Sequence, residues 1–146
     1  MNGRPSRRHR GFTLVEAAFV TVVVGLSCAA LLQLLAAGTV ANVESAELTS
    51  AVNVANNLHE GTISMTFAQV AALNNKDYSP PVDSRMTAIA SLGSTWKQHV
   101  DVAYVDPQNL SALSGTGATA AARVTVTVYH NSNKVYDTRW VICNVP

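Results

Sequence analysis

An acidic residue, Glu16, lies at the beginning of a long apolar stretch of the chain. A carboxylate in lipid is costly, so an ionisable group at such a position suggests a functional site with a charged partner. The best candidate partner is a new α-amino group. If a peptidase cuts after Gly11, Phe12 becomes the N-terminus and carries a positive charge about one helical turn before Glu16. The expected chemistry is therefore proteolytic processing, after which the Glu16 carboxylate of a neighbouring copy neutralises the Phe12 amine.

The remainder of the chain shows no pattern typical of catalysis. A Gly-x-Ser-x-Gly elbow is absent, and Gly115-Thr116-Gly117 lacks the further glycines and the lysine of a phosphate-binding loop. Three histidines have no Cys or His at ligand spacing, so we expect solvent-facing side chains and no zinc site: His59, His99 and His130. Four aspartates that could bind calcium show no regular spacing: Asp77, Asp83, Asp101 and Asp106. We therefore predict neither an enzyme nor a bound cofactor or metal.

Length and charge narrow the possible classes further. The chain has 146 residues, which fits one small domain with an N-terminal appendage. Four of the ten Lys and Arg residues fall within the first ten positions, so removal of residues 1–11 leaves six basic groups against nine acidic ones, a net charge of −3. This acidic product argues against a nucleic-acid-binding surface. Cys28 and Cys143 form no disulfide framework, and we expect each to be a lone buried thiol.

The apolar stretch after the basic start has the properties of a membrane-spanning helix. No charged residue occurs from Ala17 to Leu35, close to the roughly 20 apolar residues that a bilayer requires. The preceding arginines stay in the cytoplasm by the positive-inside rule, which places the C-terminal bulk outside it. A secretory signal peptide, cut near Ala30 or near residues 36–38, and an uncleaved signal-anchor are the alternatives. Neither alternative explains Glu16.

The run Arg-His-Arg-Gly, followed by Phe-Thr-Leu-Val-Glu and an apolar helix, resembles the type IV prepilin signal shared by pilins and type II secretion pseudopilins. The resemblance implies that a membrane aspartyl peptidase cleaves after Gly11 and N-methylates Phe12, and that Glu16 aids assembly in register. Gly25 resembles a helix-loosening glycine of the family. The proline that many major pilins carry further along is missing, with Gln33 in that vicinity, which favours a minor pilin or a pseudopilin.

The function implied by this resemblance is structural: a subunit of an envelope-spanning filament, either a minor pseudopilin of a type II secretion-like system or a minor type IV pilin. The implied partners are prepilin peptidase, other pilin or pseudopilin subunits, an inner-membrane assembly platform, and membrane lipid before assembly. The implied location is the bacterial inner membrane, with a single span and the head outside the cytoplasm, followed by a periplasmic or surface filament. The alternatives are a tip subunit for adhesion or DNA uptake and, more remotely, a signal-anchored periplasmic enzyme or scaffold.

The expected fold is α+β, with a long N-terminal helix packed on a small antiparallel sheet as in pilins. Four segments are expected along the chain: a basic leader at 1–11, the membrane and assembly half of the helix at 12–38, its amphipathic half at 39–61, and a globular head at 62–146. The apolar stripe of the amphipathic half should contain Leu48, Val52, Ala55 and Leu58. Gly61 is the expected end of the helix.

Within the head, the pattern predicts a short second helix from Thr66 to Leu73, followed by loop to about Gly93. Three strands rich in Val, Thr, Tyr and Trp are expected: His99–Val105, Arg123–His130 and Lys134–Cys143. The last two should form a hairpin around residues 131–133, and residues 107–121 should form a surface loop. In the final strand we expect the face that carries Trp140 and Ile142 to be the core face.

Overall fold

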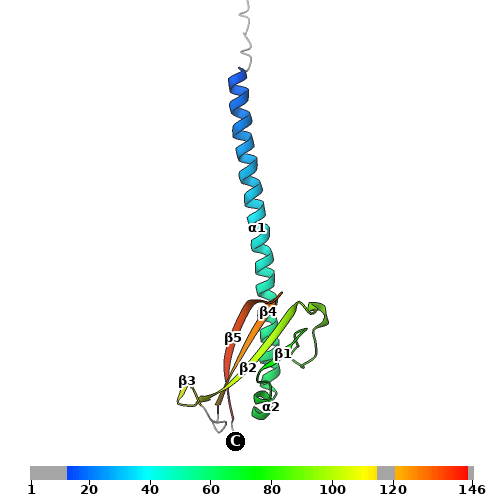
Figure 1. Ribbon diagram of the computed structural model, residues 1–146, viewed down its shortest axis with the longest axis vertical. Coiled ribbons are helices and arrows are strands. Elements are labelled where there is room, and N and C mark those ends of the chain that lie inside the picture. The colour runs from blue at the N-terminus through cyan, green and yellow to red at the C-terminus, as the bar shows by residue number, and fades with distance from the viewer. Residues whose placement is uncertain (1–12, 115–120, 145–146) are drawn as a thin grey trace, which may run out of the picture. The chain divides into compact units, whose positions relative to one another are not determined.

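The computed structural model describes residues 13–114 and 121–144, and Figure 1 shows its helices and strands. The chain divides into two units after Val43. Helix α1, Leu14–Ile63, contributes residues to both of them. The expected leader, 1–11, lies outside the described residues.

In the first unit, the described residues form the apolar part of helix α1. Thr13 caps its start, because its Oγ1 accepts a hydrogen bond from the backbone N–H of Glu16 at 3.3 Å. Polar side chains inside this part satisfy themselves locally: the hydroxyl of Thr21 donates to the Ala17 carbonyl, and that of Ser27 donates to the Val23 carbonyl, both at 2.8 Å. With a window of mean hydropathy 2.3, α1 is long and apolar enough to cross a membrane, as predicted.

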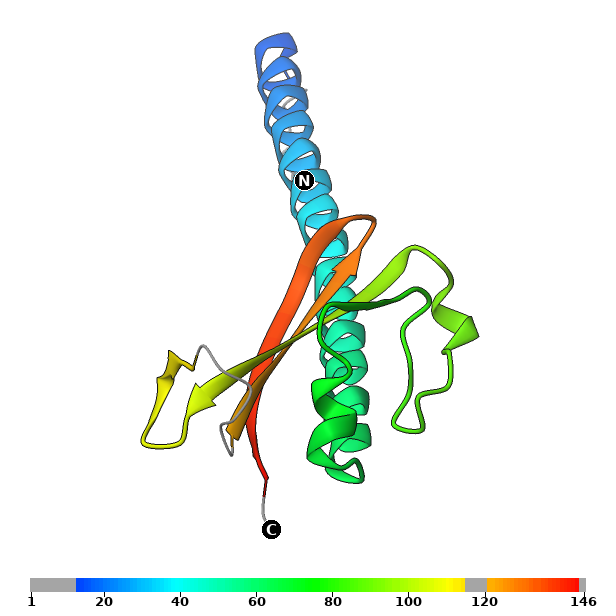
Figure 2. The ribbon, with the colours of Figure 1, turned by 60° about the horizontal axis from the view of Figure 1, so that its bottom comes forward.

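The second unit is an antiparallel sheet packed on the C-terminal part of α1, so the predicted α+β arrangement is confirmed (Figures 1 and 2). Its five strands are β1, Lys76–Tyr78; β2, Trp96–Asp106; β3, Asn109–Leu113; β4, Ala121–His130; and β5, Asn133–Cys143. The order across the sheet is β1-β2-β4-β5, and β3 pairs with the end of β2. The three predicted strands are present with longer bounds. The predictions of loop at β1 and at β3 were wrong.

The core lies between alternate residues of the central strands and one stripe of α1. Val124, Val126 and Val128 on β4 are fully buried, because side chains two residues apart share one face of a strand. The buried apolar stripe of the helix is Ala51, Val54, Ala55 and Leu58. The predicted stripe was therefore wrong in part, since Leu48 is 46% exposed and Val52 is only half-buried. Alanine at 51 and 55 lets the helix backbone approach the sheet closely.

The β4–β5 hairpin has a tighter turn than expected. His130 pairs with Asn133, so only Asn131 and Ser132 connect the strands. Both have positive φ, +50° and +67°, as a two-residue type I′ turn requires. In the resulting register Trp140 lies opposite the buried Val124, which confirms the predicted core face of β5.

Helix α1 ends at Ile63 and not at the expected Gly61. Gly61 is buried inside the helix, where a Cβ would lie 2.9 Å from the backbone oxygen of Ser84. Glycine is therefore present because the following loop passes close to the helix. The short second helix is confirmed as α2, Phe67–Ala71, with a capping box in which the backbone N–H of Gln69 donates to Thr66 Oγ1 and that of Thr66 to Gln69 Oε1.

One buried polar side chain, Gln98 on β2, joins the helix, the sheet and the loop after β1. It is fully buried. Its Nε2 donates to the carbonyl of Val54 on α1 at 3.0 Å, and its Oε1 accepts from the backbone N–H of Val82 at 3.1 Å. Both ends of the amide are thus paired, as a buried polar group requires.

Candidate functional site

The predicted assembly residue, Glu16, lies in the first turn of α1 and is exposed. A negative side chain is favourable at this end of a helix, where unpaired backbone N–H groups carry partial positive charge. Among the described residues, no basic side chain pairs with the Glu16 carboxylate. The predicted cleavage and methylation site, Gly11 and Phe12, lies outside those residues, so the charge pair between Phe12 and Glu16 stays a prediction.

Large apolar side chains of α1 between Leu14 and Val43 are exposed in the structure. Nine of them are more than 60% exposed: Leu14, Val15, Phe19, Val22, Leu26, Leu31, Leu32, Leu34 and Leu35. An apolar surface of this extent marks a site of contact with lipid or protein. Gly25, the predicted flexible position, has no atom within 4 Å of where its Cβ would be, so nothing within the chain requires a glycine there.

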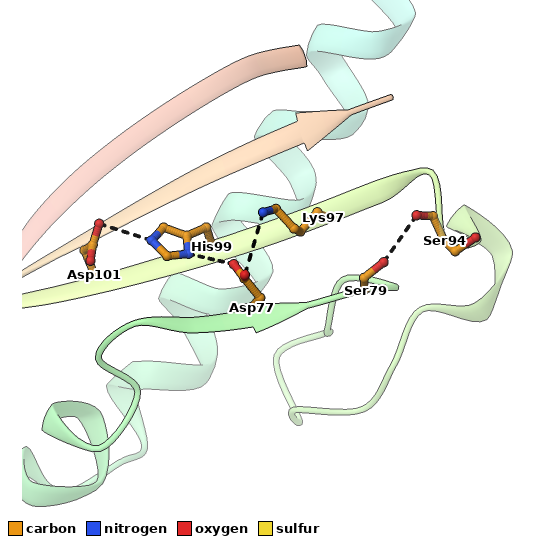
Figure 3. A network of polar contacts seen from close by, with 6 residues as sticks. All are labelled: Asp77, Ser79, Ser94, Lys97, His99 and Asp101. Atoms are coloured by element: carbon orange, nitrogen blue, oxygen red, sulfur yellow. Dashed lines mark hydrogen bonds and ion pairs between the residues drawn. The ribbon is translucent and has the colours of Figure 1, made fainter. Parts of the chain in front are cut away.

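A polar network covers part of the sheet beside β1 (Figure 3). His99 on β2 lies between two carboxylates: its Nδ1 is 2.6 Å from Asp77 Oδ1, and its Nε2 is 3.3 Å from Asp101 Oδ2. Lys97 Nζ is 3.7 Å from the other oxygen of Asp77. The hydrogen bond from His99, helped by the charge of Lys97, lowers the pKa of the Asp77 carboxyl below its ordinary value.

The contacts of this network join β1 to β2. In the described chain, His99 has ion-pair and hydrogen-bond partners in Asp77 and Asp101, no hydrogen bond to it from a serine, threonine or cysteine side chain is present, and Thr127 is its cross-strand neighbour on β4. The nearby Ser79 hydroxyl donates to the backbone carbonyl of Ser94 at 3.2 Å (Figure 3). The arrangement fits a charge cluster that ties β1 to β2.

The prediction of scattered, solvent-facing histidines was wrong, because each is half-buried and has a partner. Besides the His99 network, His130 Nδ1 lies 3.0 Å from Glu47 Oε1 on α1, and its ring stacks on Trp96 at 4.4 Å. His59 meets the ring of Trp140 edge-on at 4.7 Å. Sequence spacing missed Asp77, Glu47, Trp96 and Trp140 as partners because they lie far from these histidines in the chain. Across residues 13–114 and 121–144, no group of His, Cys, Asp and Glu side chains could hold a metal ion.

Two of the aspartates considered as calcium ligands, Asp83 and Asp106, accept hydrogen bonds from the backbone of nearby turns. Asp83 Oδ1 accepts hydrogen bonds from the backbone N–H groups of Arg85 and Thr87, at 2.9 and 2.8 Å, which fixes the turn beside Gly61. Asp106 Oδ1 accepts from the N–H of Gln108. These are local turn contacts of the kind short acidic side chains make.

The expectation of buried thiols was also wrong. Cys28 on α1 and Cys143 at the end of β5 are both free and exposed. For Cys28 the exposure follows from its place on an uncovered apolar helix, which the sequence could not distinguish from a buried one.

Comparisons with protein-family models, curated proteins and solved structures gave no match. The described residues combine a helix with an exposed apolar first part, an acidic residue in its first turn, and a C-terminal part that packs against the sheet of a small head.

Proposed function

We propose that this chain is a pilin-like structural subunit of an envelope filament, cut after Gly11 by prepilin peptidase and assembled through α1. The observation that carries the proposal is the exposed apolar surface of α1 together with a carboxylate, Glu16, in its first turn that pairs with no basic side chain of residues 13–114 and 121–144. Lipid can cover the apolar side chains before assembly, and the helices of neighbouring copies can cover them afterwards. The Phe12 amine created by cleavage supplies the counter-charge that Glu16 needs in either apolar environment.

The side chains of α1 also suit close packing against other helices. Small residues recur at every fourth position of the apolar part, interrupted once by Gln33: Ala17, Thr21, Gly25, Ala29, Ala37 and Ala41. Such a row lets helix backbones approach closely in an apolar medium. A Cβ at Gly25 would meet nothing in this chain, so the space beside it is open to a neighbour.

The proposal places the chain in the bacterial inner membrane, with its head outside the cytoplasm, until an assembly platform moves it into the filament. On this proposal the head has a pilin-like fold, in which the sheet packs against the C-terminal part of the assembly helix. The described residues favour neither the secretion pseudopilus nor the type IV pilus, so the machine is to be identified by cross-linking the subunit to its neighbours in the native membrane.

The first test is the mass and N-terminal sequence of the protein from its native membrane. We expect a chain that starts at N-methylated Phe12. A start at Met1 or Asn2 would show an uncleaved anchor, and a start after Ala30 would show a signal peptide; either result would refute the proposal.

The second test is Glu16→Gln. We expect cleavage to be retained and incorporation into filaments to be lost, because the Phe12 amine would lack its counter-charge. The matched control is Glu44→Gln, which makes the same change at an exposed position of the same helix and should leave incorporation unchanged. Normal incorporation of Glu16→Gln would contradict the charge-pair argument even if processing at Gly11 were found.

A further inference from the structure

We propose that a cleft at one end of the sheet binds a carbohydrate. The cleft has a volume of about 310 Å³ and is lined by Ser79, Ser94, Thr95, Lys97, Tyr129 and Ser132. These residues come from the end of β1, the start of β2, the end of β4 and the β4–β5 turn. Figure 3 shows three of them, Ser79, Ser94 and Lys97, beside the charge cluster of His99. This inference is independent of cleavage and filament assembly.

The walls of the cleft are held in place by contacts within the head. The Ser79 hydroxyl donates to the Ser94 carbonyl at 3.2 Å, which joins the chain after β1 to the chain before β2. The backbone N–H of Asn131 donates to the Thr95 carbonyl at 2.9 Å, which fixes the β4–β5 turn against the same segment. Ligand groups therefore meet a site that is already formed, which lowers the entropic cost of binding.

The floor of the cleft is fixed as well. Lys97 and Tyr129 are cross-strand partners on β2 and β4. The ammonium of Lys97 lies 5.0 Å from the centre of the Tyr129 ring and 3.7 Å from the Asp77 carboxylate. These two contacts orient the ammonium. At 3.7 Å the contact with Asp77 is an ion pair and not a hydrogen bond, so the N–H donors of Lys97 remain available to a ligand.

The chemistry of the lining favours an uncharged ligand with many hydroxyl groups. Five of the six lining residues carry a hydroxyl group, the kind of group that both donates and accepts hydrogen bonds, as the hydroxyls of a sugar do. The Ser79 hydroxyl already donates to the Ser94 carbonyl, so it offers a ligand its acceptor lone pairs. An anion such as phosphate is disfavoured, because the single cation of the lining, Lys97, is already balanced by Asp77, and a second carboxylate, Asp101, lies on the far side of His99.

The volume of the cleft lies at the lower end of the range for small-molecule sites, about 300–1,000 Å³. It therefore fits one sugar unit of a longer chain and not an extended oligosaccharide. For a ligand of that size bound mainly through hydrogen bonds, we expect a dissociation constant of the order of 1 mM.

The test is a titration followed by proton–nitrogen NMR of the full chain in lauryldimethylamine oxide, a detergent without a sugar headgroup. The probes are the methyl glycosides of glucose, galactose, mannose and N-acetylglucosamine, each raised to ~50 mM, and inorganic phosphate as an anionic probe. Two variants remove cleft groups: Lys97→Met removes the ammonium, and Ser132→Gly removes a hydroxyl while keeping a residue that tolerates the positive φ. The matched control is Lys134→Met, an exposed lysine of the same hairpin outside the cleft.

We expect at least one glycoside to shift the amide signals of Thr95, Lys97 and Ser132. Its affinity should fall at least fivefold in Lys97→Met and measurably in Ser132→Gly, and it should be unchanged in Lys134→Met. The proposal is overturned if none of the four glycosides shifts these signals, or if phosphate shifts them in preference to the sugars. It is equally overturned if both cleft variants, folded as judged by their spectra, bind the glycoside as tightly as the unaltered chain.

Discussion

Replacing Gly61 by alanine tests whether this residue allows a close contact or merely ends a helix. Inside a helix, alanine is favoured over glycine by about 1 kcal/mol, so a glycine without packing constraints should give a more stable variant. Here, however, the new Cβ would lie 2.9 Å from the Ser84 oxygen. Overpacking of this kind costs about 2 kcal/mol. The net expectation is a loss of about 1 kcal/mol, or a drop in Tm of about 4–8 °C for a head of this size.

The assay is thermal unfolding of the full chain in detergent, followed through the tryptophan fluorescence of the head. The matched control is Gly38→Ala, at another glycine of the same helix. A Cβ at Gly38 would have no atom within 4 Å, so this change should not lower Tm. The strain depends on a loop that cannot move away, and Asp83 holds that loop by two backbone hydrogen bonds. Asp83→Ala should therefore relieve part of the cost, so that the double variant loses less than the sum of the single variants. A Tm of Gly61→Ala equal to or above that of the unaltered chain would refute this reasoning.

Three further changes probe the head and its orientation. Gln98→Leu removes the oxygen that accepts the hydrogen bond from the backbone N–H of Val82. The free energy of unfolding, measured in urea, should fall by about 2 kcal/mol. An unchanged urea midpoint would contradict the importance of this buried amide. The pKa of Asp77 is lowered mainly by its hydrogen bond from His99, so the ionised carboxylate stabilises the fold above the ordinary value near 3.8. That stabilisation should be lost as the pH falls through the lowered pKa of Asp77. Below this pH, the free energy of unfolding should be the same for Asp77→Asn and for the unaltered chain. A difference that persists at lower pH would contradict the ion-pair explanation. A membrane-impermeant maleimide should label Cys143 from outside the cytoplasm and leave Cys28 unlabelled before assembly; failure to label Cys143 in intact cells, with labelling after the membrane is opened, would contradict the proposed orientation.

The features that the sequence predicted well are those with a strong local signal. Strands β4 and β5 combine alternating Val, Thr, Tyr and Trp with turn-forming residues between them, so their pairing followed directly. The core face with Trp140 was favoured, although alternation alone does not decide between the two faces. The capping box of Thr66 and Gln69 lies at the start of the predicted second helix. In each case, residues close together in the chain determine the structure.

The features that it missed depend on contacts between distant residues. Strand β1 is only three residues long, Lys-Asp-Tyr, and pairs with β2 through a register that no local pattern reveals. Asp77, which pairs with His99, and Glu47, which pairs with His130, lie 22 and 83 residues away in the chain. Gly61 carries the usual signal of a helix end, and its true role appears only with the position of Ser84. The cleft was missed for the same reason, because its hydroxyls belong to four separate segments.

The stretch of α1 that holds the head core has a mechanical consequence. No linker separates the exposed apolar residues before Val43 from the buried residues Ala51, Ala55 and Leu58, since all belong to one hydrogen-bonded helix. Within the second unit, a pulling force on this helix therefore acts directly on the packed core and is not absorbed by flexible chain, as it would be in a tethered domain. It reaches the sheet through the side chains of the core and the Gln98 amide. The packing of the core therefore sets the force that the head withstands before it separates from the helix.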